Sequence, residues 1–281
     1  MSEIFDYFKL PPNLSYTRFL LSNNDSYHYG IIDNGTGFKG FGGDRDETKA
    51  QTKAVFELIE RTVFKKKDEG HTSSGWAAHE SLILAKESAC LELIERDAIL
   101  CSWLLRISPK IIFTEVFSVF EKEFPILQFG KGNTFFIYGV ILEYKNKKML
   151  ISTSATSYNE GLKKLRIDSE RAFELLLDES AIDDKRLLEH HNHFCNLTKK
   201  DLEWFYLNGK GLEYKILNFQ FDVFEVPLWN GETAWVVKAL SKQLQNLFFG
   251  PTSDEYLNSL RLSELNKRFT SILNRSFHPI L

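Results

Sequence analysis

An exact five-residue repeat constrains the fold of this chain more than any other feature. The sequence ELIER occupies residues 57–61 and recurs 35 positions later, at residues 92–96. Around each copy the apolar residues recur with the period of an amphipathic helix, so residues 50–67 and 76–105 are predicted to be helices. On such helices the two acids and the arginine of each copy share one face, while the Leu-Ile pair points into a core.

The acidic faces of the repeat predict a site for divalent cations and phosphate. If the two helices pack side by side, four carboxylates converge, and they raise one another's pKa unless cations neutralise them. Magnesium is the usual hard cation for oxygen ligands, and it prefers a few carboxylates together with phosphate oxygens. Arginine can hold phosphate in a bidentate fashion. The residues of this predicted site are Glu57, Glu60, Arg61, Glu92, Glu95 and Arg96.

This predicted nucleotide site would be made from helix faces rather than from a P-loop, since no GxxxxGK[ST] pattern occurs in the chain. A single ExxER copy is more often an exposed helix face with weak salt bridges of about 0.2–0.5 kcal/mol each. Two identical copies in tandem, each preceded by a loop of glycine or small residues, favour a functional site.

Composition excludes several classes of function. The 281 residues carry 35 Lys and Arg against 38 Asp and Glu, a net charge of −3, so no global field favours nucleic acid. Three cysteines without a CxxC spacing argue against a disulfide framework. The chain shows no signal peptide and no apolar run of about 18 residues for a membrane helix. We therefore expect a cytoplasmic protein without a membrane or nucleic-acid partner.

The remaining chain predicts an α+β fold in one domain, residues 1–281. Residues 16–32 predict a hairpin with its turn at 23–25, and residues 110–155 predict several strands with a turn at 145–147. Helical periodicity returns at 159–180. The tail predicts a strand pair near 214–219 and 235–239, followed by a polar helical end.

Four segments of the sequence resemble the YcaO superfamily. The run GFGGDRDETKAQTKAVFELIERT (40–62) resembles its first ATP-binding helix, and SSGWAAHESLILAKESACLELIERDAI (73–99) resembles its S-N-G-x-A-A-G…E-x-x-E-R-D-A segment. More faintly, SYNEGLKKLRIDSERA (157–172) is similar to a later family helix, and His278-Pro279 to the usual family ending. The resemblance extends from about residue 35 to residue 281, and its strong motifs lie within 39–98.

The resemblance implies a YcaO-like mixed or antiparallel sheet with two tandem ATP-binding helices. It also implies an ATP- and magnesium-dependent enzyme that phosphorylates a peptide backbone amide oxygen, giving azolines, amidines or thioamides in ribosomally made peptides such as bacteriocins. The precursor peptide and a leader-binding or ThiF-like protein are the implied partners, and a homodimer is left open. By position, the resemblance implies two sets of residues. Magnesium would be bound by Glu57, Glu60, Glu92 and Glu95, and ATP by Arg61, Arg96, Lys53, Ser88, Lys164 and Arg171.

Several positions depart from the family pattern. Leu84 stands where the family has a glutamate that binds magnesium, although Glu80 could supply another carboxylate. The departures leave a second hypothesis open, a non-catalytic YcaO-fold subunit that binds a partner protein or precursor peptide. A third is an unrelated α+β protein with a fortuitous repeat. The departing residues are Lys53, His79, Glu80, Leu84, Ser88, Lys164, Asp168 and Arg171.

Other conspicuous residues are given structural interpretations. His190, His191, His193 and Cys195 form a dense cluster, but adjacent helix positions point about 100° apart and the flanking residues predict a solvated surface, so a metal site is not preferred. Cys90 is interpreted as a small core residue. The glycine-dense stretch 35–43 is interpreted as turns rather than as a phosphate cradle. For Trp76 the sequence does not distinguish a pocket wall from packing.

Overall fold

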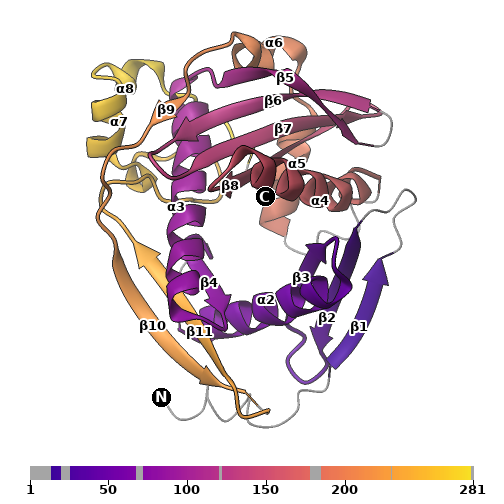
Figure 1. Cartoon of the computed structure of the whole chain (residues 1–281). Coiled ribbons are helices and arrows are strands. Elements are labelled where there is room, and N and C mark those ends of the chain that lie inside the picture. The colour runs from indigo at the N-terminus through magenta and orange to yellow at the C-terminus, as the bar shows by residue number, and fades with distance from the viewer. Residues whose placement is uncertain are drawn as a thin grey trace. The chain divides into compact units, whose positions relative to one another are not determined.

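The computed structural model describes residues 14–19, 26–67, 72–119, 122–177, 185–228 and 230–279 (Figure 1). The chain divides into two compact units: unit 1 is Met1–Cys90 with Phe219–Leu240, and unit 2 is Leu91–Asn218 with Ser241–Leu281. The boundary falls inside helix α3 (Leu82–Leu105). Mixed helices and mostly antiparallel strands confirm the α+β class, while the single domain stays a prediction.

The first sheet of unit 1 is an antiparallel meander covered by the helix that carries the first ELIER copy. Its strands are β1 (Leu14–Phe19), β2 (Tyr27–Asp33) and β3 (Lys39–Asp44), in the order β1-β2-β3. The pairing of β1 with β2 confirms the predicted hairpin, and its predicted turn lies outside the described residues. Helix α2 (Glu47–Lys67) packs on β3 (Figure 1) and is capped by Asp46, whose Oδ1 accepts from Lys49 N at 3.0 Å.

Two glycines allow β3 to approach α2 closely. A Cβ atom at Gly40 or Gly42 would lie closer than 3.0 Å to the helix backbone, at the carbonyl oxygens of Ala54 and Ala50 respectively. The prediction of turns for this glycine-dense stretch is therefore wrong for residues 39–44, which form a strand. The glycines serve a close backbone contact, because no other residue leaves room for it.

We expect Gly42→Ala to destabilise the protein by about 1–3 kcal/mol, because the added methyl group overlaps a helix carbonyl that cannot move without shifting α2. Urea unfolding followed by tryptophan fluorescence measures the change. The matched control is Gly35→Ala, whose Cβ would lie 3.4 Å from the nearest atom, Asp33 Oδ1. A loss for Gly42→Ala no larger than for this control would contradict the expectation.

The second sheet of unit 1 joins segments distant in sequence. It consists of β4 (Trp76–His79), β10 (Gln220–Pro227) and β11 (Thr233–Leu240), antiparallel in the order β10-β11-β4. The predicted helix start at residue 76 is wrong, because residues 76–79 pair with β11 and the helix begins at Leu82. The predicted strand at 214–219 lies instead at 220–227. Trp76 is buried and stacks on Phe224 with 5.5 Å between ring centroids, so it packs in the core.

Unit 2 is built on an antiparallel sheet, β5 (Lys110–Val119), β6 (Lys122–Lys131), β7 (Phe136–Tyr144) and β8 (Lys147–Ala155), with β9 (Leu212–Glu213) parallel to β6. Lys145 and Asn146 have φ of 47° and 68°, as a two-residue I′ turn requires, which confirms the predicted turn. Helices α4 (Tyr158–Leu177) and α5 (Lys185–Cys195) pack on β8. The described part of α4 agrees with the helix predicted at 159–180.

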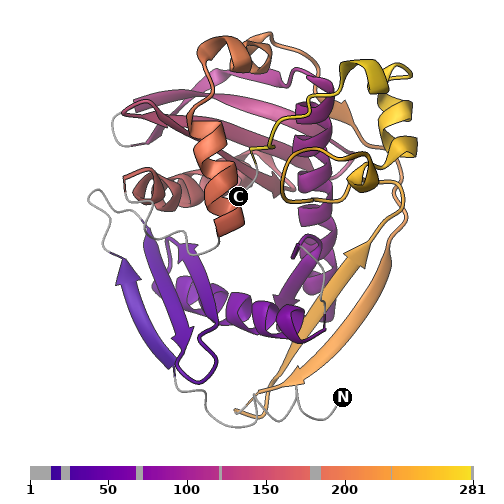
Figure 2. The ribbon, with the colours of Figure 1, turned by 180° about the vertical axis from the view of Figure 1, so that it is seen from behind.

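Short helices complete unit 2, and a C-terminal segment lies along α3 (Figure 2). Asn274 N donates to Leu104 O at 2.8 Å, and Trp103 Nε1 donates to Ser276 O at 3.5 Å. Within the described ranges, no helix combines the length and apolar character needed to cross a membrane. The short helices are α6 (Lys199–Leu202), η2 (Glu203–Tyr206), η3 (Asp254–Tyr256), α7 (Ser259–Leu265) and α8 (Phe269–Ile272).

Candidate functional site

The first ELIER copy has the orientation expected of it. Leu58 and Ile59 are buried, 2% and 1% exposed, whereas the acidic side of α2 borders solvent. Arg61 Nη2 lies 2.5 Å from Glu57 Oε1, and the backbone N of Phe41 donates to Glu57 Oε2 at 2.9 Å. Strand β3 therefore fixes the Glu57 carboxylate from one side while Arg61 partly neutralises it.

Lys53 lies one helical turn before Glu57, on the same face of α2. Its Nζ donates to Asp44 Oδ2 at 2.8 Å and to Gly43 O at 3.1 Å, and the Asp44 side chain is only 6% exposed. The positive charge at this departing position is thus held by the end of β3, next to the acids of the first copy.

The second ELIER copy repeats this orientation on α3. Leu93 and Ile94 are buried, and Arg96 Nε lies 3.8 Å from Glu92 Oε1. Glu95 is 8% exposed, and its Oε1 accepts a hydrogen bond from Ser152 Oγ at 2.7 Å. Arg96 Nε is buried and has no hydrogen-bond partner among the described residues. This copy therefore contains a buried acid and a buried guanidinium nitrogen that both have unused hydrogen-bonding capacity.

Two departures from the family pattern lie on the same face of α3 as Glu92 and Glu95. Leu84 and Ser88 precede Glu92 by eight and four residues, which is close to whole turns of an α-helix. Leu84 is 42% exposed, and Ser88 is exposed as well. An apolar side chain therefore stands on the surface where the resembling family carries a carboxylate.

Lys164 and Arg171 belong to α4 of unit 2. Lys164 Nζ lies 2.8 Å from Glu160 Oε1 and donates to Ser154 O at 3.2 Å. Burial alone would raise the pKa of Glu160, but hydrogen bonds from Lys164 and Thr156 outweigh it and lower that pKa to about 2. Arg171 is exposed. Lys164 therefore lies beside a carboxylate whose lowered pKa keeps it ionised at neutral pH.

The predicted site residues are divided between the two units. Unit 1 contains Lys53, Glu57, Glu60, Arg61 and Ser88, and unit 2 contains the other predicted site residues. Among residues that the structure describes, no group of three or more His, Cys, Asp or Glu side chains is arranged to hold a metal ion. The convergence of the two copies on one magnesium–nucleotide site stays a prediction. The predicted residues of unit 2 are Glu92, Glu95, Arg96, Lys164 and Arg171.

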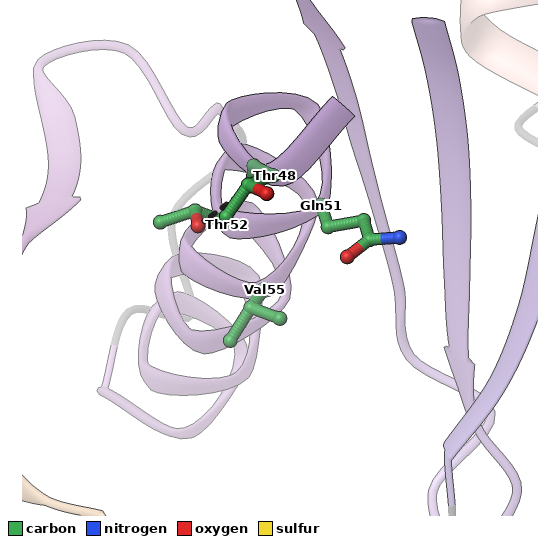
Figure 3. A pocket seen from close by; sticks show the side chains of 4 residues that line it. All are labelled: Thr48, Gln51, Thr52 and Val55. Carbon is green, nitrogen blue, oxygen red and sulfur yellow. Dashed lines mark hydrogen bonds between the residues drawn. The ribbon is translucent and has the colours of Figure 1, made fainter. Parts of the chain in front are cut away.

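A hollow of about 380 Å³ lies along another face of α2 (Figure 3). Thr48, Gln51, Thr52 and Val55 line it, and Thr52 Oγ1 donates to Thr48 O at 2.8 Å. At 100° per residue these side chains lie on the side of the helix opposite Glu57. The hollow therefore contains none of the predicted site residues.

A buried acid that the sequence reasoning missed follows directly after the second copy. Asp97 has no exposed surface and accepts from Arg261 Nη2 at 2.8 Å, Tyr214 Oη at 2.6 Å and Gln245 N at 2.7 Å. The sequence shows only that the two copies differ at this position, since Thr62 follows the first copy, and it does not identify the partners of Asp97. Asp97 lies on the side of α3 opposite Glu92. There it binds three segments of unit 2 that are distant in sequence, those of Tyr214, Gln245 and Arg261.

Two histidines of the cluster are buried, although the residues that flank them border solvent as expected. His190 and His191 are each 1% exposed because α5 packs on β8 and on the C-terminal segment. Gly250 N donates to His190 Nε2 at 2.8 Å, and His190 Nδ1 lies 3.0 Å from His278 O, as in a neutral imidazole protonated at Nδ1. Burial lowers the pKa of His190. His190 therefore connects α5 to the C-terminal segment through hydrogen bonds and packing.

The structure corrects the interpretation of Cys90 as a small core residue, because its side chain is only partly buried. The thiol is half-buried on α3, and burial, reinforced by the charge of Glu87, raises its pKa to about 11. A thiolate is the reactive form of cysteine, and the raised pKa disfavours that form at Cys90.

Comparison with solved structures identifies the fold of this chain. Neither family models nor curated protein sequences match the chain. YcaO from Methanopyrus kandleri, bound with AMPPCP and Mg2+, matches with a TM-score of 0.58 and 10% identity over 95% of this chain and 90% of that one. A chain of the E. coli microcin synthetase McbBCD complex with pro-MccB17 bound gives 0.58 and 13%, over 82% and 88%.

A third structure, a heterocyclase in complex with substrate and cofactor, matches with a TM-score of 0.61 and 10% identity. The match covers 95% of this chain and 55% of that one, so the chain spans about half of the heterocyclase. At such identities the similarity concerns the fold. This chain therefore has the YcaO fold, which confirms the resemblance that its ELIER repeat and flanking motifs predicted.

Proposed function

We propose that this chain is an ATP- and magnesium-dependent enzyme that activates a backbone amide of a peptide. A Cys, Ser or Thr side chain of the peptide, or an external sulfide, would attack the amide carbonyl carbon. Phosphorylation of the resulting oxygen then makes it a leaving group, and it departs as phosphate. Azoline and thioamide products follow from these nucleophiles, and an amidine follows when an amine nitrogen of the peptide attacks instead.

The repeat on a YcaO fold is the observation that carries the proposal. In both copies the arginine faces the glutamate four residues before it, with nitrogen–oxygen distances of 2.5 Å at Arg61 and 3.8 Å at Arg96. Groups of both signs thus border solvent on two helices whose Leu-Ile pairs are buried. Phosphoryl transfer needs positioning and charge neutralisation more than covalent help from the protein.

The side chains of this chain fit a magnesium nucleotide chemically. Among the described residues the buried Nε of Arg96 has no hydrogen-bond partner, and Glu95 accepts one hydrogen bond, from Ser152, so a phosphate oxygen and a cation could add to them. Bound ATP would supply the phosphoryl group. The carboxylates of the two copies would hold Mg2+, Arg61 and Arg96 would neutralise phosphate charge, and Lys53 and Lys164 would add positive charge nearby.

The proposed substrate class is based on one of the structural neighbours. The microcin synthetase structure holds a precursor, pro-MccB17, in a complex of several proteins. We propose that this chain likewise acts on a ribosomally made precursor peptide together with a leader-binding or ThiF-like partner protein.

Calorimetric titration with ATP, with and without Mg2+, tests the proposal. We expect magnesium-dependent binding by the wild type and at least tenfold weaker binding by Glu60→Gln combined with Glu95→Gln, because two of the four carboxylates lose their charge. Glu123→Gln, at an exposed acid of β6, is the matched control and should bind as the wild type does. The proposal fails if the wild type shows no magnesium-dependent binding, or if the double variant binds equally well.

The exposed Leu84 supports a second candidate function, a non-catalytic subunit that binds a partner protein or precursor peptide. An apolar side chain on the face of α3 that carries Glu92 and Glu95 suits protein contact better than metal binding. Binding of ATP without hydrolysis in the presence of a precursor peptide would favour this candidate. Restoration of hydrolysis by Leu84→Glu would identify the departing residue as its cause.

A further inference from the structure

The Glu95 carboxylate is nearly buried and is only partly satisfied by the protein. It is 8% exposed, and within the described ranges its one hydrogen-bond partner is the hydroxyl of Ser152, at 2.7 Å. A carboxylate has about four lone-pair positions. Burying it beside a single neutral donor is costly unless a cation joins it. The surroundings of Glu95 therefore suit a carboxylate with one oxygen fixed by the protein and the other open to a cation.

Ser152 is held on a rigid element. It belongs to β8, where it pairs with Gly139 of β7 in the middle of an antiparallel ladder. Because side chains alternate along a strand, Ser152 and Ser154 point to the same face of the sheet. Of these two hydroxyls, that of Ser152 donates to Glu95, which lies 57 residues earlier in the chain. The position of this hydroxyl is thus set by the sheet and not by helix α3 itself.

We propose that Ser152 is a positioning residue for Glu95, fixing one carboxylate oxygen so that the other points to the divalent cation. The inference rests on the proposed function, since the cation is the magnesium of that site. Partners that hydrogen-bond to a metal ligand from outside the coordination shell fix its orientation, and their loss typically weakens metal affinity 10- to 100-fold.

Titration of Mg2+ at fixed concentrations of a fluorescent ATP analogue tests this role. We expect Ser152→Ala to raise the Mg2+ concentration for half-maximal binding about tenfold or more. Ser152→Thr keeps a hydroxyl on a side chain that suits a strand, and it should restore the wild-type value. Ser154→Ala, which removes a buried hydroxyl from the same face of β8, is the matched control and should leave the Mg2+ dependence unchanged.

Two further comparisons separate positioning from a general structural effect. In a Glu95→Gln background, Ser152→Ala should cause no additional change, because the hydroxyl acts through the carboxylate. Unfolding midpoints without ligand show whether the variants fold. If the wild type responds to Mg2+ but Ser152→Ala behaves as Ser154→Ala does, the role of Ser152 is overturned and the proposed function stands. If the wild type binds neither Mg2+ nor ATP, both proposals fall.

Discussion

Replacing Asp97 with alanine is expected to destabilise the protein by about 3–5 kcal/mol. The carboxylate has no exposed surface, and Arg261 reaches it through Nη2 at 2.8 Å and Nε at 3.2 Å. Removing it leaves the buried Arg261 guanidinium with the exposed carboxylate of Glu264, 4.0 Å away, and it removes the acceptor of the Tyr214 hydroxyl and of the Gln245 backbone N–H. A buried charge that loses its partner costs far more than the pair itself contributes.

The free energy of unfolding in urea, followed by tryptophan fluorescence, measures this loss. The control is Asp254→Ala, because the Asp254 carboxylate also binds an arginine, Arg275 at 2.9 Å, but its side chain is 79% exposed. Exposed pairs contribute about 0–1 kcal/mol. Equal losses for the two variants would show that Asp97 is not the buried anchor that its contacts indicate.

Features governed by local rules could be predicted from the sequence. The burial of Leu58 and Leu93 and the orientation of the repeat follow from helix periodicity alone. The turn at Lys145 and Asn146 follows from strand patterns on both sides of residues that tolerate positive φ. In these cases neighbours in sequence are also neighbours in space, so the pattern contains the information.

Features that depend on distant partners could not be predicted. Residues 76–79 continue a helical pattern, yet they form a strand because β11, far along the chain, pairs with them. Asp97 meets Arg261 across 164 positions, and Ser152 meets Glu95 across 57. The sequence around a single residue does not identify a contact partner so far along the chain. The candidate site shares this limit, because the faces of the repeat were predictable one helix at a time, whereas their convergence depends on how two units associate.

Acidification is expected to destabilise the protein through the buried pair of His278 and His190. His278 has no exposed surface, its Nε2 donates to Phe248 O, and its ring lies 4.3 Å from that of His190. Burial lowers the pKa of His278 to about 3, with His190 and Arg96 further disfavouring its charged form. The unfolded chain has a pKa of about 6.5 at this residue. Between these two values the unfolded state binds more protons, so stability rises with pH.

The stability that His278 contributes is therefore fully present above about pH 6.5 and is lost as the pH falls toward 3, by up to about 1.4 kcal/mol per pH unit. Urea unfolding at a series of pH values between 4 and 7 measures this slope. His278→Gln keeps a neutral amide donor for Phe248 O and cannot titrate. The free energy of unfolding should therefore depend less steeply on pH in this variant, and only the contribution of His190 should remain of the pair. The control His79→Gln removes a histidine of unit 1. An unchanged slope for His278→Gln, or equal flattening by His79→Gln, would contradict the assignment, because the proton that opposes folding would then bind elsewhere.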